Sequence, residues 1–576
     1  MKDKLMQKNV AEIVVDTLVK AGAKRCWGIV GDTINHFTDA VRTSDLNWVG
    51  VRHEEVGAFA AGGEAFMTGE LAVCAGTCGP GSLHFLNGIF ESHRNGAPVV
   101  LIASDVARTE VGLNFPQEVD QRRIYEQCSV FCEYISHPSQ ARRITTLAAQ
   151  AALTRGGVAV IIVNGDMFKE TTEDDLAWSV HRPKPRLLPS DDELGALADI
   201  LSDAPAVTIY AGFGARAAHD QVVALAEKLK APVVHTSRAK EFIEPENPYN
   251  VGMTGILGNR AGANAIESAD IVLCLGMDFA WTQYYPSAER VIQIDSDHTH
   301  IGRRSPVKMG LVGDVASTID ALLPKLQDRT QDKHLSSILK EWKGDRATYE
   351  DDAEIHDPAL IHPQTVTRML DRLADDSAIF TADGGSPMVW LLRYLTAKGE
   401  RRFLTSLLHG TMANAYPQAI GIKSAYPERQ VIALCGDGGM TMLMGDLLTL
   451  VQHDIPVKLL VFNNGSLGFV EMEQRVEGLL DSFTDLKNPD FSKLADACGL
   501  DSWRVESSDD LEPAMQKWLS AKGPALLDVK VNRMELVMPP KIEASQVFST
   551  AMFGMKAVLD GRTKEVVSLL RDNFIK

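Results

Sequence analysis

Short apolar runs rich in valine and isoleucine recur along the chain, and stretches with helical character separate them. In the first third such runs lie at 71–76, 99–103 and 158–163, with a helical stretch from about 82 to 94 between the first two. Strands that alternate with helices are typical of a parallel sheet, because each crossover places a helix on one face of it. The sequence therefore predicts an α/β protein.

Two breaks in this pattern divide the chain. Residues 181–190 read HRPKPRLLPS, a linker too rich in proline and charge to hold a core. A charged, weakly patterned stretch runs from about 327 to 363. Strand-like runs lie between and after these breaks, at 207–210, 232–235, 271–275, 291–294, 379–381, 431–434 and 457–462. We predict three doubly wound parallel-sheet domains, at 1–180, 181–335 and 336–530, and a C-terminal amphipathic tail at 531–576.

The composition excludes some classes of protein. A net charge of −18 argues against broad nucleic-acid binding. Several of the eight cysteines lie in apolar runs, which is typical of buried thiols in a reducing compartment. Two CxxxC pairs, Cys74/Cys78 and Cys128/Cys132, leave a zinc site open, although core packing is favoured. The N-terminus is not typical of a signal peptide, and no apolar run is long enough to cross a membrane. We expect a cytoplasmic enzyme.

The sharpest motif lies in the third block. The run VIALC ends in Gly436-Asp437-Gly438-Gly439, and 27 residues after Asp437 a second apolar run ends in Asn463-Asn464. This separation fits one strand-to-strand crossover, so both polar side chains can reach neighbouring carboxyl ends of parallel strands. Carboxylate and amide oxygens suit Mg²⁺, and the glycines let a backbone approach phosphate. The motif favours a metal-bridged diphosphate site over a simple glycine turn.

This pair of motifs resembles the thiamine-diphosphate signature, and nearly the whole chain resembles the pyruvate oxidase family, in particular its bacterial quinone-dependent, membrane-associated branch. The likeness rests on five segments in combination: RHEEVGAFAAGGEA at 52–65, CGPGSLHFLNG at 78–88, NPYNVGMTGILG at 247–258, HGTMANAYPQAIG at 409–421 and FNNGSLGFVEME at 462–473. It implies a pyrimidine-binding first domain, a central FAD domain and a diphosphate-binding third domain.

The resemblance also implies a catalytic acid in the first domain. Glu54 matches the family's glutamate, whose carboxylate bonds the aminopyrimidine ring of the cofactor. A carboxylate in a closed apolar site can have a raised pKa, which suits this role. Taken alone, the Arg52–Glu55 cluster could simply cap a helix. The family builds its site across a subunit interface, which implies at least a dimer and, in this branch, a homotetramer.

Other residues carry cofactor roles only by matching the family. Met412 matches the bulky residue that holds thiamine diphosphate bent, although a methionine there could be core filling. The implied magnesium ligands are Asp437, Asn464 and Ser466. The implied contacts to thiamine diphosphate are Gly410, Thr411, Met412, Asp437, Gly438, Gly439, Asn464, Gly465, Ser466, Leu467, Gly468, Phe469 and Val470.

The middle block resembles a flavin domain. A GxG turn at 212–214 follows a strand-like run, which alone is weak evidence. Asp295 ends the run VIQID, where an acidic residue can hold a nucleotide hydroxyl. The remaining implied FAD contacts are Thr254, Gly255, Ile256, Leu257, Met277, Asp278, Phe279, Ala280 and Trp281. A middle domain that keeps this fold without flavin stays open as an alternative.

Two residues after the Asn-Asn motif are implied in catalysis. Phe469 matches the aromatic residue that assists electron transfer, and Glu473 would lie near the substrate; helix packing and a surface charge are the plainer interpretations. One departure concerns the substrate pocket. Residues 115–118 read Phe-Pro-Gln-Glu, so Pro116 stands where relatives align a phenylalanine and fixes φ there.

The tail and the reaction complete the prediction. Apolar residues between 547 and 575 recur at near-helical spacing, which fits either docking on the protein itself or a membrane interface. In the quinone-dependent relatives the tail binds the lipid bilayer. The resemblance implies oxidation of pyruvate to acetate and CO₂, with electrons passing through FAD to ubiquinone or menaquinone at the inner face of the cell membrane. An acetolactate-synthase-like carboligase with non-redox FAD and a non-catalytic cofactor-binding protein are the alternatives.

Overall fold

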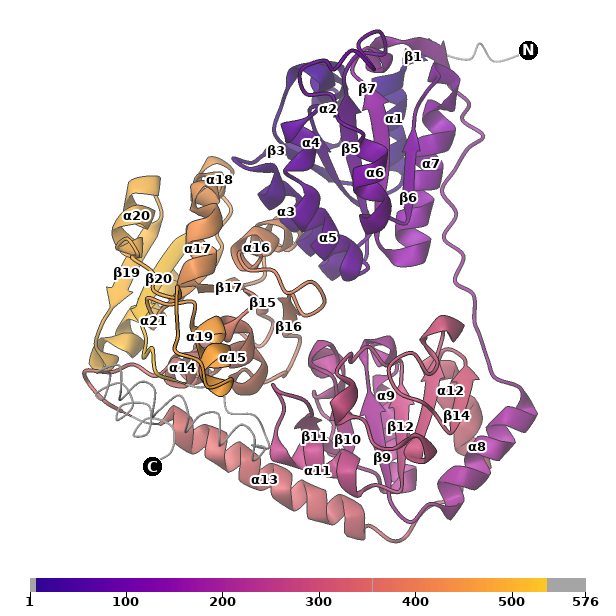
Figure 1. Cartoon of the computed structure of the whole chain (residues 1–576), viewed down its shortest axis with the longest axis vertical. Coiled ribbons are helices and arrows are strands. Elements are labelled where there is room, and N and C mark those ends of the chain that lie inside the picture. Colours follow the sequence, from indigo (N-terminus) through magenta and orange to yellow (C-terminus); the bar gives the residue numbers. More distant parts are fainter. Residues whose placement is uncertain (1–6, 355, 536–576) are drawn as a thin grey trace.

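The computed structural model describes residues 7–354 and 356–535, and it contains three six-stranded sheets in which every strand pair is parallel (Figure 1). Helices lie on both faces of each sheet. The predicted fold class of three parallel-sheet α/β domains is therefore confirmed. The domain boundaries stay predictions, and most of the predicted tail, 536–576, lies outside the described residues.

The first domain has the strand order β3-β2-β4-β5-β7-β6. Its strands are β2 (Arg25–Gly28), β3 (Asn47–Gly50), β4 (Ala72–Gly76), β5 (Val99–Asp105), β6 (Phe131–Tyr134) and β7 (Val158–Asn164). Its helices are α1 (Val10–Lys20), α2 (Asn35–Arg42), α3 (Glu54–Thr68), α4 (Pro80–Leu83), α5 (Leu86–Arg94), α6 (Gln121–Tyr125) and α7 (Ala141–Ala151). A separate antiparallel pair joins β1 (Gln7–Asn9) to β8 (Thr171–Glu173). The central strands β5 and β7 are buried at every residue, which explains their continuous apolar sequences.

The middle domain has the order β11-β10-β9-β12-β13-β14, which is the dinucleotide-fold order 3-2-1-4-5-6. Its strands are β9 (Val207–Ala211), β10 (Val233–His235), β11 (Asn250–Met253), β12 (Ile271–Leu275), β13 (Val291–Asp295) and β14 (Met309–Val312). Its helices are α8 (Asp191–Asp203), α9 (His219–Leu229), α10 (Lys240–Ile243), α11 (Arg260–Ser268) and α12 (Val315–Leu322).

The third domain has the order β16-β15-β17-β18-β20-β19, the same arrangement as the first domain. Its strands are β15 (Ile379–Ala382), β16 (Arg402–Thr405), β17 (Val431–Gly436), β18 (Lys458–Asn463), β19 (Asp501–Val505) and β20 (Ala525–Lys530). Its helices are α14 (Pro363–Leu373), α15 (Ser386–Tyr394), α16 (Ala415–Ala425), α17 (Asp437–Leu443), α18 (Leu447–Gln452), α19 (Gly468–Val476), α20 (Phe491–Cys498) and α21 (Leu511–Ser520).

The charged stretch before the third domain forms a long helix, α13 (Lys333–Ala353), which connects the middle and third domains (Figure 1). Its pattern is weak because part of its packing is polar. Asp345 accepts hydrogen bonds from the backbone N–H of Ala261 at 2.8 Å and from the side chain of Asn259 at 3.1 Å. The helix therefore caps the start of α11 with a carboxylate, an interaction that hydrophobic periodicity does not reveal.

The first and third domains share one buried core at the crossing of α3 and α16. Glycines and alanines on α3 allow this close approach, since a Cβ at Gly63 would lie 2.6 Å from the carbonyl oxygen of Gln418. On the other side, a Cβ at Gly421 would overlap the carbonyl oxygen of Ala60. The glycine-rich sequence of α3 is thus explained by packing between domains.

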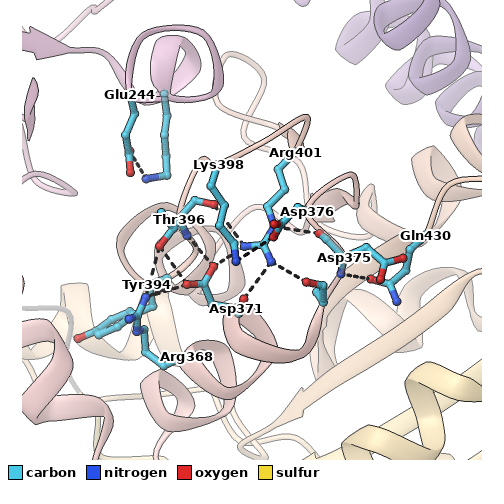
Figure 2. Close-up of polar contacts among 12 residues, drawn as sticks. Glu244, Arg368, Asp371, Asp375, Asp376, Tyr394, Thr396, Lys398, Arg401 and Gln430 are labelled. Atoms are coloured by element: carbon cyan, nitrogen blue, oxygen red, sulfur yellow. Dashed lines mark hydrogen bonds and ion pairs between the residues drawn. The ribbon is translucent and has the colours of Figure 1, made fainter. Parts of the chain in front are cut away.

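A buried ionic cluster joins α14 to the end of α15 and the start of β16 (Figure 2). The guanidinium of Arg401 pairs with Asp371, and it also donates to the backbone carbonyls of Asp371 and Ala374 at 2.9 and 2.8 Å. Asp371 accepts from the backbone N–H of Thr396 at 2.8 Å, just beyond α15. Arg368 donates to the carbonyl of Tyr394, the last residue of α15, at 3.2 Å. The carboxyl end of α15 is therefore firmly anchored.

Within the described part of the chain, no helix is both long enough and apolar enough to cross a membrane. Six of the eight cysteines are buried. Burial raises the pKa of the Cys128 thiol to about 12 and that of Cys132 to about 11. No group of three or more His, Cys, Asp or Glu side chains in residues 7–354 and 356–535 could hold a metal ion.

Candidate active site

A small cavity lies at the carboxyl ends of three neighbouring strands of the third domain. The strand order reverses between β15 and β17, and ligands of open α/β sheets bind at such switch points. The cavity measures about 70 Å³. Its walls are Asp383–Ser386 after β15, Met412, Gly436–Gly439 after β17, Phe462 at the end of β18, and Asn464 and Ser466–Val470 after it. The two halves of the predicted motif, Asp437 and Asn464, are therefore brought together.

Asp437 is a buried carboxylate whose partners are all N–H donors. It accepts hydrogen bonds from the backbone N–H of Gly438 at 2.8 Å and of Gly465 at 2.7 Å, and from the side chain of Asn488 at 2.8 Å. Burial raises its pKa in spite of these donors, and no cationic side chain of the described residues offsets the charge. A divalent cation bound here would supply the missing positive charge, so the site fits Mg²⁺.

The side chains of the other two predicted metal ligands already form hydrogen bonds within the protein. The side-chain oxygen of Asn464 accepts from the backbone N–H of Ser466 at 3.0 Å, which leaves a second lone pair. The hydroxyl of Ser466 donates to Glu471, so its hydroxyl is directed to that carboxylate. The backbone carbonyl of Ser466 is the group that could reach a metal.

Met412 lies against the glycine turn, as the cofactor role requires. A Cβ at Gly438 would lie 3.1 Å from the terminal methyl of Met412 and 2.9 Å from a methyl of Leu467, so both side chains pack closely on the glycine. Three further predicted contacts lie outside the cavity wall. Gly410 lines the neighbouring cavity described below, Thr411 donates to the carbonyl of Met412 at 2.9 Å, and Gly465 binds Asp437 through its N–H.

Asp383 is a site residue that the sequence analysis missed. Its buried carboxylate accepts from the backbone N–H of Ala415 at 2.9 Å and of Gly436 at 3.0 Å, so it ties the segment after Met412 to the glycine turn. Desolvation raises its pKa to about 7. The signal was available, because Asp383-Gly384-Gly385 follows an apolar run as GDGG does.

Glu54 begins α3 in the first domain and is buried. The Nδ1 atom of His84 lies 2.9 Å from its carboxylate, and the rings of His53 and His84 stack with their centroids 4.8 Å apart. Neither of the two cavities described in this section contains a residue of the first domain. The thiamine-type cavity is also well below the roughly 300–1,000 Å³ of most ligand pockets. The predicted acid therefore lines neither cavity, although the first and third domains of one chain meet nearby, where the side chain of Asn87 donates to Glu55 at 2.6 Å and to Thr411 at 3.1 Å.

The loop that carries the Pro116 departure lies beside the turn next to Glu54. Gln117 has a φ of 71°, and the thiol of Cys78 donates to its side-chain oxygen at 3.2 Å. A Cβ at Gly79 would lie 2.6 Å from the Cβ of Gln117, so only glycine allows this contact. The residue after Pro116 therefore contacts the segment at 78–79, directly before α4, and His84 follows the end of that short helix.

A larger cavity of about 590 Å³ lies between the middle and third domains. From the middle domain its walls include Thr236, Ser237, Arg238 and six predicted FAD contacts: Thr254, Ile256, Leu257, Asp278, Phe279 and Trp281. From the third domain they include Met388, Ser406–Leu408, Gly410, Phe469, Met472, Glu473, Val476 and Glu477. The predicted residues Phe469 and Glu473 thus lie in the same wall.

This cavity fits a flavin. Aromatic and aliphatic side chains form most of its surface, which suits a planar ring system. Arg238 lies with its guanidinium 4.1 Å from the ring centre of Phe213 and 3.3 Å from Asp278, and it can face an anionic diphosphate. Burial and the neighbouring Glu477 raise the pKa of Glu473.

Four predicted FAD contacts do not line this cavity. Met277 is buried beneath it, and Ala280 is exposed. Gly255 has a φ of 88° and packs so closely that a Cβ would lie 2.6 Å from the ring of Phe279. Asp295 accepts from the backbone N–H of Asp297 at 3.0 Å at the end of β13.

The GxG turn has a packing role. A Cβ at Gly214 would lie 2.6 Å from the Cα of Gly276, so the turns after β9 and β12 meet backbone to backbone at the switch point of the sheet. Neither Gly212 nor Gly214 lines the cavity.

Comparison with known protein families identifies the family of this chain. Residues 8–124 match the N-terminal TPP binding domain of thiamine pyrophosphate enzymes, 194–322 their central domain, and 383–529 their C-terminal TPP binding domain. The chain belongs to the thiamine pyrophosphate enzyme family. The expected thiamine cofactor is therefore supported, and the three matches follow the order of the three domains of this thiamine enzyme.

Individual relatives span nearly the whole thiamine enzyme. It is 32% identical over 571 residues to a putative thiamine pyrophosphate-containing protein, YdaP, of Bacillus subtilis, covering 98% of this chain and 99% of the relative. It is 29% identical over 552 residues to a pyruvate oxidase of Lactiplantibacillus plantarum, with 93% and 91% covered. It is 28% identical over 558 residues to a probable acetolactate synthase large subunit of Methanocaldococcus jannaschii, with 92% and 93% covered.

Proposed function

We propose that this thiamine enzyme converts pyruvate and water into acetate and CO₂ and passes the two electrons through FAD to a membrane quinone, which takes up two protons and becomes the quinol. One observation carries the proposal: Phe469 lines both the thiamine-type cavity and the flavin-type cavity. A single aromatic side chain in a shared wall would separate the two cofactors by little, which favours electron transfer between them. The likeness to a pyruvate oxidase supports pyruvate as the substrate.

The residues of the third domain bind and orient the first cofactor. Asp437, the amide oxygen of Asn464 and the carbonyl of Ser466 would hold Mg²⁺ with the diphosphate, and Met412 would pack against the cofactor. When bound, thiamine diphosphate supplies a nucleophilic carbon that accepts the electrons released with CO₂. The glycine turn contributes backbone N–H groups and close approach, while Asp383 keeps that turn and the Met412 segment in register.

The catalytic acid would come from a second copy of the chain. Glu54 contacts His84 and does not line the cavity of its own chain, and that cavity is smaller than most ligand pockets, which supports a contribution from a second chain. A carboxylate in this buried position can exchange a proton with the aminopyrimidine ring of the cofactor. A homotetramer built from such dimers agrees with the resemblance to the quinone-dependent branch.

The identity of the electron acceptor is the most specific part of the proposal. The proposed acceptor is ubiquinone or menaquinone at the inner face of the cell membrane, which the enzyme would reach when its tail binds lipid. This part of the proposal is based on the resemblance to the quinone-dependent branch. We propose a cytoplasmic, peripherally membrane-associated enzyme. Phospholipid vesicles with a short-chain quinone test this: the acceptor turnover should rise with vesicles in the full chain and not in a chain that ends at residue 535.

The deciding experiment is a visible spectrum under anaerobic conditions, before and after adding pyruvate with thiamine diphosphate and Mg²⁺. A yellow protein that bleaches on addition of pyruvate agrees with the oxidase. A yellow protein that consumes pyruvate without bleaching contradicts it. A colourless protein that still decarboxylates pyruvate removes the flavin from the mechanism.

A carboligase of the acetolactate-synthase type is the second candidate. The chain is about as similar to an acetolactate synthase subunit, at 28%, as to a pyruvate oxidase, at 29%. An artificial electron acceptor separates the two, because only the oxidase reduces the dye when pyruvate is added. A non-catalytic cofactor-binding protein is the third candidate. Separately, if a Glu54→Gln variant turned over pyruvate as fast as the unaltered protein, Glu54 would have no part in the mechanism.

A further inference from the structure

Helix α15 lies between the two proposed cofactor cavities. Gly385 and Ser386 at its amino end line the thiamine-type cavity, and Met388 in its first turn lines the flavin-type cavity. Arg393 stands seven residues beyond Ser386, roughly 10 Å further along the helix axis. The amino end of the helix therefore borders both cavities, and Arg393 lies about two helical turns away from that end.

Arg393 binds a segment of the middle domain through backbone oxygens. Its guanidinium donates to the carbonyls of Ile256 at 3.1 Å, Leu257 at 3.2 Å and Gly258 at 3.4 Å. The side chains of Ile256 and Leu257 line the flavin-type cavity. One arginine of the third domain thus holds the turn at 255–258, which forms part of the middle domain's share of the cavity wall.

The position of Arg393 is itself fixed. Tyr394 and Thr396, directly after it, are bound by Arg368 and Asp371, and the buried Arg401 completes this cluster (Figure 2). A second contact between the two domains lies close by, because Glu241 accepts from Arg402 at 2.9 Å and from the backbone N–H of Phe403 at 2.6 Å. Arg393 therefore extends from an anchored helix end and not from a mobile surface.

We propose that Arg393 is a positioning residue that sets the place of the flavin relative to the thiamine site. It does so by holding the turn at 255–258 on the end of α15, whose other end forms part of the thiamine-type cavity. This rests on the proposed flavin function. Arginine is suited to the role because its planar fork can reach three carbonyls at once, whereas lysine offers a single point of charge.

The test uses the full chain with Arg393→Met and Arg393→Lys. In the flavin-free protein, hydrogen exchange of the Gly258 and Asn259 amides, which bond within this turn, should be about tenfold faster in Arg393→Met than in the unaltered protein. In the loaded protein, pyruvate should reduce the flavin between about tenfold and a hundredfold more slowly, because small misplacements of reacting groups cost this much. Decarboxylation, followed as CO₂ released in one turnover, should change by less than about twofold. Arg393→Lys should give rates of exchange and of flavin reduction between those of Arg393→Met and those of the unaltered protein.

Arg372→Met is the matched control, since Arg372 lies exposed on the neighbouring helix α14, and it should behave as the unaltered protein. Unchanged exchange and unchanged flavin reduction in Arg393→Met would overturn the proposal. A slowed CO₂ release of the same size as the slowed flavin reduction would also overturn it, because the residue would then serve the whole site. A protein that binds no flavin at all would refute the proposed function, while the exchange measurement would still decide whether Arg393 holds the turn.

Discussion

The carboxylate of Asp437 shows how one residue can predict a ligand. Its burial is costly without a positive partner, and the described residues offer it only N–H donors. We expect Asp437→Ala to weaken the binding of Mg²⁺ with thiamine diphosphate by about a hundredfold or more, judged from the size of effects of ligand-shell changes. Titration calorimetry with both components checks this. Asp454→Asn, at an exposed turn residue with a φ of 50° that asparagine adopts readily, should bind normally.

A buried histidine in the middle domain gives a prediction about pH. Burial lowers the pKa of His235 from 6.5 to about 4. The unfolded chain therefore takes up a proton at a higher pH than the folded chain does. Stability from this residue is complete above about pH 6.5 and falls as the pH drops towards 4, with a loss of about 2 kcal/mol by pH 5.

Thermal unfolding of the unaltered protein and of His235→Asn between pH 7.5 and 5 measures this loss. The unaltered protein should lose stability relative to the variant as the solution is acidified below about pH 6.5. Parallel curves for the two proteins would show that the histidine does not titrate in this range.

Individual site residues could be predicted from the sequence when they directly follow a strand, because the strand itself is easy to recognise. Asp437, Asn464 and Met412 meet in one cavity, as the spacing and the resemblance indicated. His84 and Asn488 were missed because each lies far in sequence from the carboxylate that it binds. Such partners come from tertiary contacts, and an isolated histidine or asparagine carries no local signal of them.

At the scale of elements, the crossing of α3 and α16 depends on glycine. A Cβ at Gly421 would overlap a backbone carbonyl of α3, which cannot move aside as a side chain can. We expect Gly421→Ala to reduce the free energy of unfolding by about 1–3 kcal/mol, the usual cost of overpacking. Denaturant unfolding checks this. Gly344→Ala on α13, where a Cβ would meet nothing within 4 Å, should instead stabilise by about 0.5–1 kcal/mol.

The strands could be predicted closely because parallel strands buried on both faces have continuous apolar sequences. The run expected at 431–434 is β17 at Val431–Gly436, and that expected at 71–76 is β4 at Ala72–Gly76. The helix expected from about 82 to 94 is two helices, α4 and α5, with Pro80 opening the first. Helix α13 was missed although Leu335, Ile338, Leu339 and Trp342 follow helical spacing, because the many charged residues around this short apolar stripe obscure it. The GxG turn was correctly placed at a strand end, but packing alone explains its glycines.

At the scale of the whole molecule, the proposed site needs two chains, and mixed subunits can test this. Chains with Glu54→Gln keep the metal site, and chains with Asp437→Ala keep the acid. Refolded together in equal amounts, they should recover about one quarter of the unaltered activity, because half of the random dimers combine both types and each of these has one intact site. Either variant alone should be nearly inactive.

Full inactivity of the mixture, with mixed dimers verified by mass spectrometry, would contradict a site shared between subunits. The sequence could suggest this sharing only through the family resemblance. No spacing between residues 54 and 437 tells whether they meet within one chain or between two.

The first and third sheets have the same strand order, and their helices α3 and α16 pack directly on each other. The two sheets thus repeat one topology, and the middle domain lies between them in the sequence. In the proposed site, one of these units would hold the metal-binding turn and the other the acid, so neither would suffice. A second chain related by a two-fold axis would offer the missing half to each, and two complete sites would form together. A chain organised in this way would act only in pairs.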